Sequence, residues 1–151
     1  MKLIGKMKRF TDIIFFNKDN KLLLLRRSDN CDWMPGKLCL PGGHLDEGLS
    51  LLQNAKKELE EEAGIMATHL TKIENHTFKT GDYTTIFYCF EHVKMLDGSI
   101  FQNCVMETGF PTLTVDEHSE YMFVTLKEFF DKKIQRQLMP EMALFMNEIF
   151  K

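Results

Sequence analysis

Three glutamates in one short segment have the types and spacing of a metal-binding group. Glu61 and Glu62 follow Glu58 by three and four positions, so on a helix the three side chains would project from one face. Like charges at these spacings repel by roughly 0.2–0.5 kcal/mol per pair in an isolated helix, and a hard cation relieves that repulsion. Mg²⁺ prefers carboxylates and completes its octahedron with waters and phosphates. The pattern therefore predicts a Mg²⁺ site, with Mn²⁺ as a substitute; the alternative is a solvated acidic face.

The helix that must carry these glutamates is marked at both ends. Ser50 is a candidate N-cap with Gln53 three positions later, which is the pattern of a capping box, and Gly64 stands where a left-handed residue ends a helix. Between the ends, apolar residues at spacings of three to four predict a buried stripe beside the acidic face. This stripe consists of Leu52, Ala55, Leu59 and Ala63.

The rest of the chain predicts a mixture of strands and helices. Two apolar runs, 11–16 and 21–25, flank the turn-rich residues 17–20 and predict a hairpin. The other expected elements are strands at 38–40, 70–78, 84–93 and 121–124 and helices at 126–131 and 140–150. Residues 94–116 are expected to form a long surface connection, which could include a strand. Two interpretations of this segment stay open, a functional loop and a tolerated insertion. This order of elements is typical of a layered α/β or α+β domain.

The segment from Gly43 to Ile65 resembles the signature of the Nudix family. That signature is a glycine, five residues, a glutamate, seven residues, and then Arg-Glu-aliphatic-any-Glu-Glu-any-Gly-aliphatic. The positions that agree with it in register are Gly43, Glu58, Leu59, Glu61, Glu62, Gly64 and Ile65. The runs 33–43 and 117–124 also resemble this family, as the lead into the signature and as a late acidic loop with its strand. The resemblance therefore covers most of the chain.

Two positions depart from the signature. Leu49 stands where the family has its first glutamate, and Lys57 stands where it has arginine. In the family these two positions can pair as a salt bridge, so we expect that loss of the carboxylate removes the need for a bidentate guanidinium and that a lysine suffices. Retention of the three metal-facing glutamates predicts an active protein. The alternative is a catalytically weak or inactive Nudix-like domain that binds a nucleotide or a protein partner.

The resemblance implies a fold, a reaction and a set of metal ligands. The fold is a Nudix-type α/β/α sandwich with a mixed β-sheet. The reaction is Mg²⁺-dependent hydrolysis of the pyrophosphate bond of a nucleoside diphosphate linked to another group, giving a nucleoside monophosphate and the phosphorylated remainder. Substrates of this kind are nucleoside triphosphates, ADP-ribose, nucleotide sugars and dinucleoside polyphosphates. The implied metal ligands are Glu58, Glu61 and Glu62. Related domains are often dimers, so a homodimer is one expected state.

Further residues are assigned to catalysis or to substrate contact. Catalysis is assigned to Glu58, Glu61 and Glu117, with Glu58 on the helix and Glu117 or Glu120 in the late loop as alternatives for the base that takes a proton from the attacking water. The substrate-binding candidates are Gly42, Gly43, Arg27 and Glu120. His44 and His118 are interpreted as polar wall residues rather than catalysts. Aromatic side chains for stacking a base are sought among Trp33, Phe78, Tyr83 and Phe110.

Length, charge and cysteine usage narrow the remaining alternatives. The 151 residues, 44% of them hydrophobic, predict one domain spanning residues 1–151. A net charge of −3 disfavours nucleic acid as a partner, because phosphate binding needs clustered lysine and arginine. No apolar run approaches the roughly 20 residues of a membrane span. Four cysteines without CxxC spacing and without a signal peptide favour reduced thiols and a cytoplasmic protein.

Overall fold

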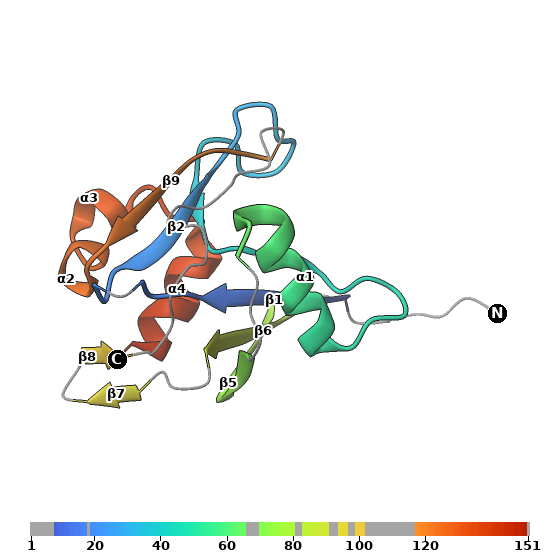
Figure 1. Cartoon of the computed structure of the whole chain (residues 1–151). Coiled ribbons are helices and arrows are strands. Elements are labelled where there is room, and N and C mark those ends of the chain that lie inside the picture. Colours follow the sequence, from blue (N-terminus) through green and yellow to red (C-terminus); the bar gives the residue numbers. More distant parts are fainter. Residues whose placement is uncertain are drawn as a thin grey trace.

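A computed structural model of the chain describes residues 8–17, 19–65, 70–80, 83–90, 94–96, 99–101 and 117–150. Between residues 70 and 101 the side chains it describes are those of Leu70, Lys72, Ile73, Thr77, Phe78 and Lys79. The elements in chain order are β1 (Lys8–Ile14), β2 (Leu22–Arg27), β3 (Leu38–Cys39), β4 (Gly42–His44), α1 (Leu51–Ala63), β5 (Leu70–Thr80), β6 (Tyr83–Phe90), β7 (Lys94–Leu96), β8 (Ser99–Phe101), β9 (His118–Val124), α2 (Leu126–Phe129), α3 (Lys132–Gln135) and α4 (Pro140–Ile149) (Figure 1).

The strands form two main sheets that are covered by helices. One sheet has the order β4-β1-β6-β5, in which β1 and β6 are parallel and the other pairs antiparallel, so it is mixed, as predicted. The second sheet has the order β3-β2-β9, and in Figure 1 its strands β2 and β9 run obliquely to β1. Helix α1 contacts β1, β4 and β5, and α4 contacts β5. The chain therefore has the α/β fold class that the sequence predicts.

The predicted hairpin of residues 11–16 and 21–25 is wrong beyond its tip. Phe16 and Leu22 form an isolated antiparallel bridge, and the amide of Leu23 donates to the carbonyl of Phe15 at 2.9 Å. From there β1 pairs with β4 and β6, whereas β2 pairs with β3 and β9. The residues 13–16 and 22–25 are all buried. Because such uninterrupted apolar runs bury both faces, each strand needs neighbours of its own in the interior of a sheet.

Helix α1 has the predicted ends, and its buried face is rotated. The hydroxyl of Ser50 accepts the amide of Gln53 at 3.1 Å and the Ser50 amide donates to the Gln53 side chain at 2.9 Å, while Gly64 is left-handed with φ 68°. Of the predicted stripe, Ala55, Leu59 and Ala63 are buried, as expected. Leu52 was placed wrongly, since it is 37% exposed, and Asn54 is buried in its stead. The physical reason is a set of hydrogen bonds that holds Asn54 against β1.

The C-terminal segments differ from the predictions in detail. The helix expected at 126–131 ends at Phe129, and Asp131 caps a separate helix, α3, by accepting the amide of Lys133 at 2.9 Å. The helix expected at 140–150 is α4, with a proline in its first turn as predicted. The expected connection at 94–116 contains the antiparallel pair β7 and β8, while 97–98 and 102–116 lie outside the described residues. Within the described part of the chain, no helix has the length and apolar character that crossing a membrane requires.

Candidate active site

The short strand β4 brings a pair of glycines underneath helix α1. Thr11 of β1 pairs with Gly43, and Asp12 pairs with Gly42. A β-carbon on Gly43 would lie 2.9 Å from the carboxyl carbon of Glu58. Glycine at position 43 therefore allows the Glu58 carboxylate to lie directly against the backbone of β4, and this close approach places the helix glutamates beside the strand.

Glu62 is the most deeply placed of the three helix glutamates. Its Oε1 accepts the amide of Gly42 at 2.6 Å, and its Oε2 lies 3.8 Å from Nε2 of His118. Burial raises the pKa of Glu62 to about 9; the amide of Gly42 opposes this rise, and the negative charges of Glu58 and Glu117 add to it. Without a cation the folded protein therefore keeps a proton on this carboxyl at neutral pH.

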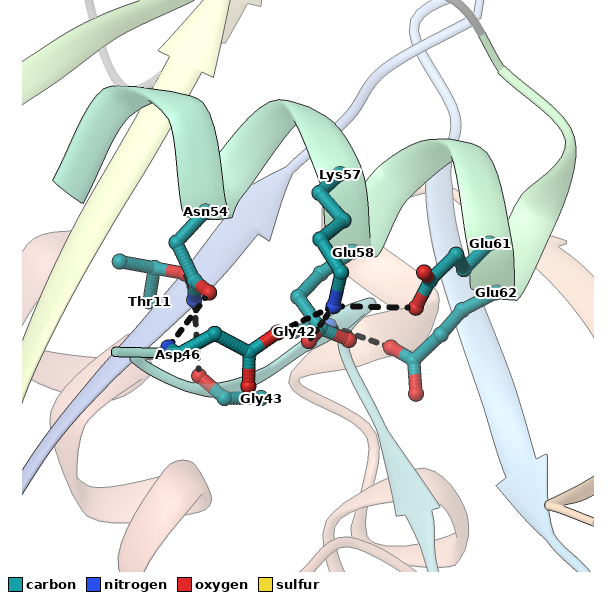
Figure 2. Close-up of polar contacts among 9 residues, drawn as sticks. All are labelled: Thr11, Gly42, Gly43, Asp46, Asn54, Lys57, Glu58, Glu61 and Glu62. Atoms are coloured by element: carbon teal, nitrogen blue, oxygen red, sulfur yellow. Dashed lines mark hydrogen bonds and ion pairs between the residues drawn. The ribbon is translucent and has the colours of Figure 1, made fainter. Parts of the chain in front are cut away.

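Glu58 and Glu61 occupy different environments on the same helix face. The side chain of Glu58 is 13% exposed, and burial, with the carboxylates of Glu61, Asp46 and Glu117, raises its pKa while Lys57 lowers it. The side chain of Glu61 is 56% exposed. Figure 2 shows the Glu58 side chain extending from α1 toward the β4 backbone and the Glu61 carboxylate turned toward Lys57. The fold thus brings Glu58 and Glu62 to the glycine strand and leaves Glu61 at the outer edge.

The start of β9 adds two side chains to this group. One ligand atom each of Glu62, Glu117 and His118 lies within 4.8 Å of the others. His118 is buried, and burial lowers its pKa to about 4, so its imidazole is neutral at pH 7. Its Nδ1 has no hydrogen-bond partner among the described residues. His118 lines the same pocket as Glu62, and its interpretation as a polar wall residue stays a prediction.

Asp12 is a site residue that the sequence interpretation missed. It lies half-buried on β1 beside Gly42 and lines a pocket with Glu62. Burial and the charge of Glu58 raise the pKa of Asp12 to about 7. The available signal was a carboxylate within the apolar run 11–16. It did not suffice to predict a site residue, because only the pairing of β1 with β4 places Asp12 beside Gly42.

A pocket of about 440 Å³ opens beside these carboxylates. Its lining residues are Phe10, Asp12, Arg27, Trp33, Cys39, Leu40, Gly42, Gly43, His44, Glu62, His118, Met139, Glu141, Met142 and Phe145. Gly42, Gly43 and Arg27 are three of the four predicted substrate-binding residues. Arg27 donates its Nε to the carbonyl of Trp33 at 2.6 Å. Large apolar walls with a few polar groups are typical of a small-molecule site.

Glu120, the fourth predicted substrate-binding residue, lies apart from the pocket lining. It forms an ion pair with Arg26 on the neighbouring strand β2. Arg26 also donates to the carbonyl of Gly36 at 2.9 Å and to the side chain of Gln137 at 2.8 Å. The guanidinium of Arg26 is therefore engaged in connecting β2, β9 and the segment before α4.

The aromatic residues predicted as candidates for base stacking lie in different places. Trp33 lines the pocket and is 60% exposed. Phe78 stacks on Phe145, a pocket residue, with ring centroids 4.4 Å apart. The side chain of Tyr83 and the whole of Phe110 lie outside the described residues. Trp33 is therefore the candidate whose ring is placed to meet a ligand.

Lys57 has a carboxylate partner that the family signature does not name. Its Nζ forms an ion pair with Asp46, and it lies 3.4 Å from Glu61 Oε2 and 3.7 Å from Glu58 Oε1 (Figure 2). The hydrogen bond to Asp46 is the main reason that the pKa of Lys57 is raised. The Nudix signature has this carboxylate at position 49, whereas this chain has leucine there and supplies a carboxylate three residues earlier, at Asp46.

The donor set suits a divalent cation. Glu58 and Glu62 offer carboxylate oxygens whose ionisation is unfavourable in the absence of a positive charge, as their raised pKa values record. Hard oxygen ligands match Mg²⁺ and Mn²⁺, and an imidazole such as His118 is tolerated better by Mn²⁺. These residues therefore fit a metal ion that would replace the proton held by Glu62 and would favour the ionised form of Glu58.

Comparison with known proteins identifies related sequences and structures. A family model described as NUDIX domain matches residues 7–143. A MutT protein from Methanosarcina mazei Go1 has a similar structure, with TM-score 0.65 and 25% identity over 99% of this chain and 96% of that one. An Ap4A hydrolase from C. elegans, in a binary complex, gives TM-score 0.59 and 18% identity over 95% of each chain. An uncharacterized Nudix hydrolase from Yersinia pestis is 40% identical over 58 residues, which are 38% of this chain and 32% of that protein.

Proposed function

Because the chain belongs to the Nudix hydrolase family, we propose that it hydrolyses the pyrophosphate bond of a nucleoside diphosphate linked to another group, in a reaction that depends on Mg²⁺ or Mn²⁺. The products are a nucleoside monophosphate and the phosphorylated remainder. The homodimer and the cytoplasmic location stay predictions from the sequence.

The observation that carries this proposal is the pair of carboxyls beside the pocket, of which Glu62 is buried and Glu58 is partly buried. A pyrophosphate group is polyanionic, so an acidic patch by itself would repel it. A bound divalent cation neutralises phosphate oxygens and activates water for in-line attack. In the proposed arrangement Glu58 and Glu62 hold the cation from the inner side, and Glu61 completes the set from the exposed edge of α1.

Glu117 is the proposed general base. It lies at the start of β9 with a ligand atom within 4.8 Å of those of Glu62 and His118, and it is exposed, so it can meet water entering the site. Its backbone is fixed, because its carbonyl accepts the amide of Ser28 at 2.8 Å and the thiol of Cys31 at 3.3 Å. A carboxylate that is carried on this fixed backbone, near the reacting water, is suited to removing the proton of that water. Glu58 is the alternative base.

A substrate panel tests the proposed function. Nucleoside triphosphates, ADP-ribose, nucleotide sugars and dinucleoside polyphosphates are each incubated with the protein, with and without Mg²⁺, and the products are separated by chromatography. We expect release of a nucleoside monophosphate from at least one class only when the cation is present. Retention of a nucleotide without cleavage across the panel would favour the alternative of a binding domain.

Replacement of Glu117 by glutamine is expected to lower kcat by about 10²–10⁴-fold, the usual contribution of a general base. The metal affinity measured by calorimetry should stay within about twofold, because a base is not required to hold the ion. A parallel loss of metal affinity would instead make Glu117 a ligand of the cation. Unchanged kcat would assign the proton transfer to Glu58.

Trp33→Ala is expected to raise KM by about tenfold with little change in kcat, since stacking on a nucleobase contributes roughly 1–3 kcal/mol per base. The matched control is Leu144→Ala. Leu144 is another exposed apolar side chain, 66% exposed, and it does not line the pocket. Steady-state kinetics on the substrate found in the panel measure both variants; an equal effect of the two would remove Trp33 from the binding site.

A further inference from the structure

A tight turn connects the glycine strand to helix α1. The amide of Leu49 donates to the carbonyl of Asp46 at 3.2 Å, and Gly48 has φ +86°. A left-handed residue at the third position is the mark of a type II turn, in which the first and fourth α-carbons lie less than about 7 Å apart. The turn therefore brings the α-carbon of Asp46 close to the α-carbon of Leu49, the position at which the family has its first glutamate.

Asp46 is anchored independently of its ion pair. Its amide donates to Oδ1 of Asn54 at 3.0 Å. The Nδ2 of Asn54 donates in turn to the hydroxyl of Thr11 at 2.9 Å and makes a longer bond to the carbonyl of Gly43 at 3.4 Å. Asn54 and Thr11 are both fully buried. The backbone of Asp46 is thus tied to β1 and β4 by a buried network (Figure 2).

The ammonium of Lys57 lies between this anchor and two carboxylates of the proposed metal site. It forms its hydrogen-bonded ion pair with Asp46, and it also forms longer ion pairs with Glu61, at 3.4 Å, and with Glu58, at 3.7 Å. An ammonium on a flexible stem moves toward the strongest negative charge in reach. Without Asp46, the ammonium would keep only Glu58 and Glu61 of these three partners, so it would move closer to them and compete more strongly with a divalent cation for their oxygens.

We propose that Asp46 is a positioning residue: it holds the Lys57 ammonium at the edge of the carboxylate group, so that Glu58 and Glu61 remain available to the cation. This inference rests on the proposed function for its metal site. It gives the departure at Leu49 and Lys57 a physical meaning, since one end of a turn supplies the carboxylate that the other end lacks.

Calorimetric titration with Mn²⁺ tests this role in the whole protein, without any substrate. Asp46→Asn is expected to weaken Mn²⁺ binding about tenfold, in the range found for residues that position metal ligands. The matched control is Glu47→Gln, which removes the same charge from the neighbouring exposed residue of the turn and should change the affinity by less than about twofold, as expected for a screened surface charge.

Two second-site variants separate this role from a purely structural one. Adding Lys57→Gln to Asp46→Asn should restore most of the affinity, because the competing ammonium is gone. Adding Leu49→Glu to Asp46→Asn should also restore it, because the turn presents the new carboxylate to Lys57. Unchanged affinity in Asp46→Asn, or failure of both rescues, would overturn the inference.

The outcome is distinguishable from failure of the proposed function. If the substrate panel shows no cleavage while Mn²⁺ binding follows the expected order of variants, the hydrolase proposal fails and the role of Asp46 stands. If the wild-type protein cleaves a substrate and Asp46→Asn binds Mn²⁺ as the wild type does, only the role of Asp46 fails.

Discussion

Glu62→Gln is expected to lower kcat/KM by at least about 100-fold and to weaken Mg²⁺ or Mn²⁺ binding, since even the residues that support metal ligands contribute 10–100-fold. The variant keeps an oxygen that can accept the amide of Gly42, so the local backbone contact is preserved. What it loses is the ability to become a negatively charged carboxylate beside a bound cation. Steady-state kinetics and calorimetry measure the two effects; normal turnover would remove Glu62 from the metal site.

The pH dependence of stability shows whether the loss of activity and metal binding in Glu62→Gln comes from misfolding. The pKa of Glu62 is raised from its ordinary 4.5 to about 9, so its contribution to stability is full below pH 4.5 and is lost as the pH rises through 9. Without metal, Glu62→Gln should therefore be more stable than the wild type at pH 8, with little difference at pH 4. Thermal melts at both pH values test this sign. Glu60→Gln, an exposed neighbour on α1, should show neither effect.

Gly42→Ala is expected to destabilise the protein by about 3 kcal/mol, at the upper end of ordinary overpacking. Its β-carbon would lie 2.4 Å from the carbonyl oxygen of Thr11 and 2.8 Å from the α-carbon of Asp12. These are backbone atoms of the paired strand, so they cannot move aside without opening β1 from β4. In a chain of this size the melting temperature should fall by roughly 6–12 °C.

Gly43→Ala is the matched comparison. The three atoms nearest to its β-carbon would all belong to the carboxylate of Glu58, at 2.9–3.0 Å, and the end of a side chain can move. We expect a loss of stability below about 1 kcal/mol together with a strong loss of activity, because Glu58 is displaced from β4. Equal melting temperatures for the Gly42 and Gly43 variants would contradict this account.

The sequence by itself determined the helix of the site and its family. The capping box at Ser50, the left-handed Gly64 and the spacing of Glu58, Glu61 and Glu62 are local features, and local hydrogen bonds and helical periodicity are enough to specify them. The register of the signature then gave the family, because both glycines and the three glutamates have to agree in spacing along one segment.

Only the tertiary structure decided which side chains meet that helix. Strand pairing sets the positions of Asp12 and His118, and a turn sets the position of Asp46, the partner of Lys57. Strand pairing and turn geometry leave no periodic pattern along the sequence, so these contacts could not be predicted from it. The separation of β1 and β2 into two sheets was missed for the same reason, since a buried apolar run does not specify which strands pair with it. The three glutamates also became unequal only on folding, because burial depends on everything packed around them: Glu62 and Glu58 face the glycine strand, and Glu61 faces solvent.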